Sequence, residues 1–311
     1  MTVTDPAFVI ELPEGHLAVH DLTPGPVDDD ARVVLAVHGI TANGLSWQRV
    51  ADGLARRRPG AVRVLAPDLR GRAASREAPG PFGLAVHAED LAGIASAFAA
   101  APVLVGHSMG AYVAALAAAR HPARFSGAVL VDGGFAFPPP PGLDLDAALA
   151  AVLGPAMARL SMRFGSAEEY LAFFDEHPAL GPLLRGPAGE VARRYILHDL
   201  VPGQDGDGWC SSCVLDAVRA DGAGVLADDE AHDAGRRAVV EHGLPVELVW
   251  AHRGLLDEPQ GLFDAERVAA LNLPEALTVT DVDANHYSVV LEEPGVTAVV
   301  DAVERTLAAR P

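Results

Sequence analysis

Short apolar runs alternate with helix-forming segments in the amino-terminal part of the chain. Residues 8–12 and 16–20 flank Pro13-Glu14-Gly15, which predicts an opening β-hairpin. The later runs are valine-rich, as buried strands are, and cover residues 33–37, 62–66, 103–105 and 128–131. The helix-forming segments cover residues 46–54, 87–98 and 111–120. This alternation predicts a parallel sheet with helices on both faces.

The alternation stops after Val131, where a run of prolines at 138–141 is followed by a long, mostly helical block. Two segments in the block have the composition of loops, residues 203–208 and 221–230. Strand-like runs return at 246–250 and 277–280, before a closing helix at 296–307.

The break predicts two parts in the chain. We expect an α/β core of residues 1–134 and 241–311, and a helical cap of residues 135–240. A block inserted between two core strands is expected over the carboxyl ends of the strands, where open α/β sheets bind ligands. The alternative is a helical satellite that only stabilises the sheet.

The strongest chemical signal is a G-x-S-x-G motif at residues 106–110, centred on Ser108. A buried strand precedes it and a helix former follows, and a sharp strand-to-helix turn exposes the serine Oγ at the end of a sheet. The flanking glycines suit a turn too tight for side chains. Ser108 is therefore expected to be a nucleophile; the alternative is a helix-capping serine without chemistry.

The composition limits the classes of partner that the protein is expected to bind. The 311 residues carry 23 basic side chains, all arginine, and 42 acidic ones, for a net charge of −19. This balance argues against nucleic acid or an anionic membrane as a partner. No apolar stretch reaches the ~18 residues of a membrane span, and the start lacks the features of a signal peptide, so we expect a cytoplasmic protein. Cys210 and Cys213 are expected to be free thiols, because no further zinc ligands stand at a suitable spacing.

A nucleophilic serine needs a base, and His286 is the candidate, in Asp283-Ala284-Asn285-His286-Tyr287 after the run at 277–280. With His38-Gly39, Asp68-Leu69-Arg70-Gly71, the G-x-S-x-G turn at residues 106–110 (the nucleophile elbow) and the late His286 in this order, nearly the whole chain resembles the α/β-hydrolase superfamily. The resemblance implies an α/β-hydrolase fold with Ser108 as nucleophile and His286 as general base. The family's usual G-x-G-x-S is replaced here by Gly71-Arg72-Ala73-Ala74-Ser75.

The resemblance also implies an oxyanion hole and a pocket. The backbone N–H groups of Met109 and Ile40 are expected to bind the oxyanion. His38 and Gly39 are expected to frame the substrate, with His38 as a structural hydrogen-bonding residue, and Trp47 either lines the pocket or only packs its helix. Aromatic and methionine side chains near or inside the block are expected in part to line an apolar pocket over Ser108, notably Phe135, Phe137, Met157, Met162, Phe173 and Trp209.

Two residues compete to orient His286. Asp257 lies in Gly254-Leu255-Leu256-Asp257, which resembles the family's G-x-x-D, but Gly254 lies further from Pro245 than in the usual pattern. Aligned by strand, Gly254 stands where the acid belongs, as in haloalkane dehalogenases whose acid has moved one strand earlier. Asp132, after the run at 128–131, matches that relocated position and is favoured; Asp257 remains the alternative.

These residues predict a serine hydrolase that cleaves a neutral, largely apolar ester, lactone or thioester through an acyl-enzyme. The serine excludes the aspartyl-ester chemistry of dehalogenases. Alternatives are hydrolysis of a C–C bond or an amide, cofactor-free haloperoxidase-like activity, or a non-catalytic receptor for a small ligand. No metal or organic cofactor is implied, and the chain is expected to be a monomer or a homodimer.

Overall fold

The computed structural model describes residues 6–12, 15–136, 144, 147–148, 154, 156–203, 206 and 208–309. Its central sheet has eight strands in the order β1-β2-β4-β3-β5-β6-β9-β10. Their bounds are β1 Phe8–Leu12, β2 Gly15–Asp21, β3 Arg32–Val37, β4 Val62–Pro67, β5 Val103–His107, β6 Gly127–Val131, β9 Val246–Arg253 and β10 Thr278–Asn285. The β1–β2 hairpin and the β2–β4 pair are antiparallel, and β4 to β10 pair in parallel. The predicted hairpin and parallel sheet are confirmed.

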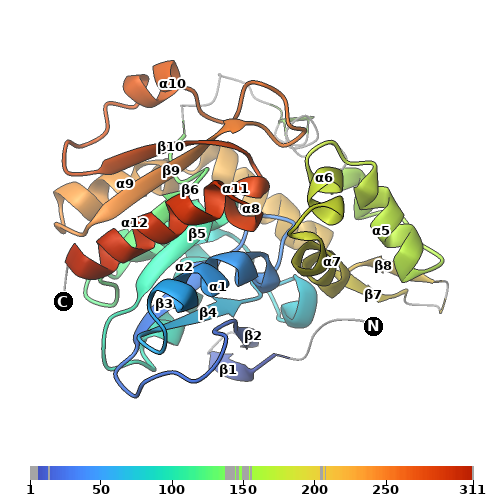
Figure 1. Cartoon of the computed structure of the whole chain (residues 1–311), viewed down its shortest axis with the longest axis horizontal. Helices are drawn as coiled ribbons and strands as arrows, with labels where there is room; N and C mark the ends of the chain where they lie inside the picture. The colour runs from blue at the N-terminus through green and yellow to red at the C-terminus, as the bar shows by residue number, and fades with distance from the viewer. Residues whose placement is uncertain are drawn as a thin grey trace.

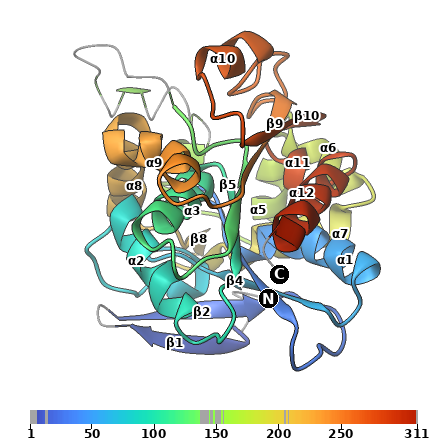
Figure 2. The ribbon, with the colours of Figure 1, turned by 90° about the vertical axis from the view of Figure 1, so that its left-hand side faces the viewer.

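Helices cover both faces of the sheet (Figure 2). One face carries α2 (Leu84–Ala95), α3 (Met109–Arg120) and α9 (Asp229–Val240), and the other carries α1 (Gln48–Arg57), α11 (Ser288–Leu291) and α12 (Gly295–Ala309). Alternate strand residues enter two apolar clusters: Leu35 joins the first, and Val34 the second. Strands buried on both faces explain the continuous apolar runs of the sequence.

Between β6 and β9 the chain forms further helices and a small sheet. Figure 1 shows α5 (Ala167–Asp175), α6 (Leu180–Arg185), α7 (Gly189–His198) and the pair β7 (Leu200–Pro202) and β8 (Trp209–Ser211) gathered at one side of the molecule. By contrast, α8 (Leu215–Ala227) and α9 contact α3 beside the sheet. The block expected to be one cap thus divides between two places, and a cap function for residues 135–240 stays a prediction.

The expected loop at 221–230 is wrong, because α8 and α9 cover it with a break only at Asp228. The Asp228 side chain caps α9 by accepting the N–H groups of Glu230 and Ala231, at 3.0 and 3.2 Å. The small residues that suggested a loop are there for close packing. A Cβ on Gly224 would lie 2.8 Å from Cγ of Leu84 in α2.

None of the described helices is long and apolar enough to cross a membrane. Cys210 and Cys213 are buried free thiols, and Cys210 lies in β8.

Candidate active site

Ser108 lies at the turn between β5 and α3, at the carboxyl end of the parallel strands. Its backbone has φ 57° and ψ −123°, a conformation that costs energy for a residue with a side chain. The glycines of the motif permit the turn: a Cβ on Gly106 would lie 2.1 Å from the Gly110 carbonyl oxygen, and one on Gly110 2.2 Å from that of Val37. The sequence therefore places a partly exposed serine on a sharp strand-to-helix turn, the geometry typical of a nucleophile elbow.

His286 and Asp132 meet beside Ser108. His286 follows the end of β10, and its Nδ1 lies 2.6 Å from Oδ2 of Asp132, which follows the end of β6. The other oxygen, Oδ1, accepts the N–H of Ala251 at 3.1 Å. Both side chains are buried. An ionised carboxylate can only accept, so this bond places the imidazole proton on Nδ1 and leaves the Nε2 lone pair available as a base.

Asp257 lies elsewhere. Its Oδ1 accepts from Nε of Arg253 at 2.8 Å and from Nδ2 of Asn285 at 3.0 Å, and its side chain is 41% exposed. Asp257 thus forms a surface ion pair next to the site, while Asp132 holds the imidazole of His286.

The loop after β3 brings its backbone close to the serine. A Cβ on Gly39 would lie 3.2 Å from Cβ of Ser108, so the position favours glycine. Ile40 and Met109 both line a cavity with Ser108. As the first residue of α3, Met109 has an N–H group without an acceptor inside its helix.

His38 holds this loop in place through two hydrogen bonds to the backbone. Its Nε2 accepts the N–H of Leu69 at 2.9 Å, so Nδ1 carries the proton and donates to the Gly39 carbonyl at 2.8 Å. Burial lowers the pKa of His38 to about 4, with opposition from Asp68, and the ring stays neutral. The ring is fully buried and does not belong to the described lining of either cavity at Ser108.

Trp47 is also fully buried, in the apolar cluster under α1 and α12, and contributes no side chain to the described lining of those cavities. This placement supports the packing alternative for Trp47.

His107, the variable residue before the nucleophile, was not singled out from the sequence. Its Nε2 lies 2.8 Å from the carbonyl oxygen of His286, and the two rings have centroids 4.6 Å apart. Burial and the neighbouring His286 hold the pKa of His107 well below its usual value, so a neutral ring donates this bond. The only available signal was its position inside the G-x-S-x-G motif.

Two cavities meet at Ser108. The larger, about 230 Å³, is mostly apolar, and Ser108, Asp132 and His286 line it. Its apolar lining comprises Ile40, Met109, Tyr112, Phe135, Ala136, Val225, Leu226, Leu255, Leu262 and Phe263. The Tyr112 hydroxyl donates to the Phe135 carbonyl at 2.8 Å and fixes this wall. The smaller, about 40 Å³, holds Ser108 and His286 together with Tyr195 and Tyr287.

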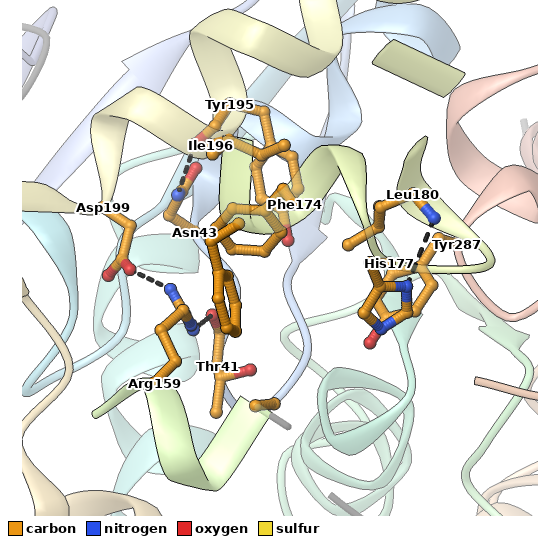
Figure 3. A pocket seen from close by; sticks show the side chains of 12 residues that line it. Thr41, Asn43, Arg159, Phe174, His177, Leu180, Tyr195, Ile196, Asp199 and Tyr287 are labelled. Carbon is orange, nitrogen blue, oxygen red and sulfur yellow. Dashed lines mark hydrogen bonds and ion pairs between the residues drawn. The ribbon is translucent and has the colours of Figure 1, made fainter. Parts of the chain in front are cut away.

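A third cavity adjoins the smaller one and shares Thr41, Ala156, Tyr195 and Tyr287 with it (Figure 3). Figure 3 shows Arg159 at one side, bonded to Asp199 and to the Thr41 carbonyl. The Arg159 charge is thus matched by the carboxylate of Asp199.

The aromatic and methionine residues expected to line one pocket over Ser108 lie in different places. Phe135 lines the large cavity, and Phe173 lines the third one. Met157 packs against the first apolar cluster, and Met162 and Trp209 against the second. Phe137 lies outside the described residues.

One buried cluster has the residue types of a metal site. His20, Asp68 and His198 place their ligand atoms within 4.8 Å of one another, the only such group in the described part of the chain. Nε2 of each histidine bonds Oδ2 of Asp68, at 2.9 and 2.8 Å, so both nitrogens carry protons and offer no lone pair. The carboxylate also accepts the N–H groups of Gly44 and Ala74. This closed network does not fit a metal ion and instead joins α7 to the core.

Comparison with known proteins agrees with the geometry. A family model described as the alpha/beta hydrolase fold matches residues 32–293, and the chain belongs to this family. The thioesterase domain from the curacin biosynthetic pathway superposes with a TM-score of 0.66 at 18% identity, covering 97% of this chain and 98% of that one. E-2-(acetamidomethylene)succinate hydrolase gives 0.67 at 22% identity, with 97% and 98% covered. These identities show a shared fold.

Two further relatives carry less functional information. A hypothetical protein from Pseudomonas aeruginosa PAO1 superposes with a TM-score of 0.67 at 24% identity, covering 97% of this chain and 99% of that one. The magnesium-chelatase 30 kDa subunit of Rhodobacter capsulatus is 36% identical over 100 residues, which is 29% of this chain. The match spans 34% of that subunit, about a third of its length.

Proposed function

We propose that this hydrolase-family protein is a serine hydrolase that cleaves a neutral, largely apolar carboxylic ester, lactone or thioester. The observation that carries the proposal is the 2.6 Å bond between His286 and Asp132 at the edge of the sheet where Ser108 lies. All three residues line one mostly apolar cavity.

The chemistry assigns one role to each group. Nε2 of His286 takes the proton of the Ser108 hydroxyl while Oγ attacks the carbonyl carbon of the substrate. The N–H groups of Ile40 and Met109 bind the oxyanion that forms. Collapse of the tetrahedral intermediate expels the alcohol or thiol, which takes its proton from His286. Water, deprotonated by His286, then releases the acid.

The cavities suggest the shape of the substrate. An apolar cavity of about 150 Å³ holds benzene, so the 230 Å³ cavity has room for an aromatic ring or a short acyl chain. Thr41, Tyr195 and Tyr287 line the smaller cavity at Ser108 and bring hydroxyl groups to it, so a short, uncharged part of the substrate is expected there. Burial raises the pKa of Tyr287 to about 12, which keeps that phenol a neutral donor.

Labelling with a fluorophosphonate tests the proposal most directly. The wild-type protein should be labelled at Ser108 and should hydrolyse short-chain aryl esters. The Ser108→Ala variant should lose both properties. A wild-type protein that takes up no label and turns over no ester would favour the receptor alternative.

A further inference from the structure

Arg72 occupies the turn where this chain departs from its family's pattern, and its guanidinium is fully buried. Nε and Nη2 both donate to the carbonyl oxygen of Ile40, at 3.1 and 2.9 Å. Nη1 donates to the carbonyl of Arg70 at 2.8 Å and pairs with Asp221 at 2.6 Å. An arginine here therefore ties the turn after β4 to the loop that contains Ile40.

Arg72 and His38 together fix the backbone of the loop beside Ser108. His38 holds the carbonyl of Gly39, and Arg72 holds the carbonyl of Ile40, so two successive peptide units have their oxygens fixed by buried side chains. In a trans peptide the N–H points opposite to the carbonyl of the same unit. The N–H of Ile40, which belongs to the first of these units, has no acceptor in the described part of the chain. Fixing both units fixes the direction of this donor.

The other end of Arg72 is anchored in α8. Asp221 accepts from Arg72 and from Nε2 of His87, the latter at 3.1 Å. Burial alone would raise the pKa of Asp221, but His87 and Arg72 lower it to about 2, so the carboxylate stays ionised. A carboxylate with two fixed donors in a buried setting holds the guanidinium in one orientation.

Helix α8 is also seated directly on this turn. The N–H of Val214 donates to the Gly71 carbonyl at 2.9 Å, and the N–H of Ala73 donates to Oγ of Ser212 at 2.8 Å. A Cβ on Gly71, which has φ +76°, would lie 2.7 Å from Cβ of Ala217. The same helix supplies Val225 and Leu226 to the apolar cavity.

We propose that Arg72, held by Asp221 of α8, is a positioning residue for the oxyanion hole. It touches no substrate atom in this assignment. It fixes the loop that contains Ile40, so that the N–H of Ile40 points toward the position of the oxyanion. It also links this loop to α8, which lines the apolar cavity. This inference rests on the proposed serine hydrolase function.

The test compares two buried arginines of the same turn. Arg72→Lys keeps a positive charge opposite Asp221 but loses the planar pair of donors to Ile40. Arg70→Lys is the matched control, because Arg70 is also buried and its guanidinium pairs with Asp90 at 2.6 and 2.7 Å and donates to the Pro79 carbonyl at 2.9 Å. Both variants are assayed for kcat, KM and binding of a trifluoromethyl ketone, which forms a tetrahedral adduct with Ser108. The corresponding methyl ketone serves as a ground-state ligand.

A displaced oxyanion donor lowers only transition-state binding, so Arg72→Lys should lose about 10- to 100-fold in kcat with KM within about twofold of wild type. Affinity for the trifluoromethyl ketone should fall by a similar factor, while the methyl ketone binds as before. Arg70→Lys should keep wild-type values for all four quantities. A merely structural Arg72 would lower the melting temperature without this split.

The proposal is overturned if folded Arg72→Lys keeps kcat and trifluoromethyl ketone affinity within about twofold of wild type. If that variant does not fold, the double variant Arg72→Gln/Asp221→Asn, which buries no unpaired charge, is judged by the same criteria. Activity that survives Ser108→Ala would instead contradict the serine hydrolase function itself.

Discussion

Nδ1 of His286 lies 2.6 Å from Oδ2 of Asp132, although 154 residues separate the two in the chain. Strand β9 lies between the strands that carry them, and Asp132 reaches across its end, where Oδ1 accepts the N–H of Ala251. The residue directly after β9 is Gly254, which has no side chain to bond the imidazole, and its carbonyl accepts the N–H of His286 at 3.4 Å. The geometry therefore supports Asp132, after β6, as the acid that orients His286.

Exchange of each candidate acid for its amide should separate them. Asp132→Asn should lower kcat by about 10⁴-fold, because an asparagine amide favours the wrong tautomer of the imidazole. Asp257→Asn should change kcat little, since it weakens a surface ion pair with Arg253 and a hydrogen bond from Asn285 but no bond to His286. Steady-state kinetics on folded variants is the measurement, and a large loss in Asp257→Asn alone would reverse the assignment.

Ser108 and His286 should behave as one unit. Ser108→Ala and His286→Ala should each lower kcat by several powers of ten, and the double variant should be no slower than the worse single one, because neither residue works without the other. A complete cycle of the four proteins with one aryl ester measures this. Additive losses, or near-native activity in His286→Ala, would rule out His286 as the base.

Much of the fold could be predicted from apolar periodicity. The strands at 33–37 and 128–131 are buried on both faces, so each is a continuous apolar run with turns at its ends. Edge strand β10 was predicted only as 277–280, but it continues to Asn285. Its exposed Asp281 and Asp283 interrupt the apolar run, because one side of the strand faces solvent. The glycines of α8 suggested a loop because sequence alone does not show the contact with Leu84.

For the site, local motifs carried more information than distant pairs. Ser108 could be predicted as a candidate nucleophile because its glycines and flanking elements are adjacent in sequence. Arg72 gave no signal as a partner of Ile40 and Asp221, because these bonds span 32 residues to Ile40 and cross from the core to α8. Such long-range polar pairs depend on the tertiary fold and leave no periodicity to detect.

The apolar cavity should limit the length of the substrate. Leu226→Trp, on the wall formed by α8, should fill part of the 230 Å³ space and raise KM for longer acyl esters while an acetyl ester is processed as before. Leu215→Trp is the matched control, because Leu215 begins the same helix and is 40% exposed. Kinetics across a series of acyl chain lengths is the measurement. An unchanged chain-length profile in Leu226→Trp would show that the acyl chain binds elsewhere.

Stability should fall as the pH is lowered from neutral. Burial lowers the pKa of His38 from 6.5 to about 4, and burial also lowers the pKa values of His107 and His177. Below about pH 6.5 the unfolded chain binds protons at these histidines while the folded protein does not, so the free energy of unfolding decreases as pH falls. At about 1.4 kcal/mol per pKa unit, His38 alone accounts for about 3 kcal/mol by pH 4. Glu247, whose pKa is raised by burial, acts in the opposite direction nearer its own range.

Urea unfolding at about pH 7, 6 and 5 measures this slope, which reports the difference in bound protons between the two states. His107→Gln keeps an N–H donor toward the His286 carbonyl but cannot titrate, so its slope should be shallower by up to one proton. His252→Gln controls for the exchange of a histidine for glutamine as such, because the His252 side chain is 40% exposed and pairs with Asp281 at the surface. A free energy of unfolding that stays constant between pH 7 and 5 would contradict this prediction. It would show that His38 and His107 take up protons in the folded protein. The neutral form assigned to His38, which holds the Gly39 carbonyl in the loop that contains Ile40, would then be wrong.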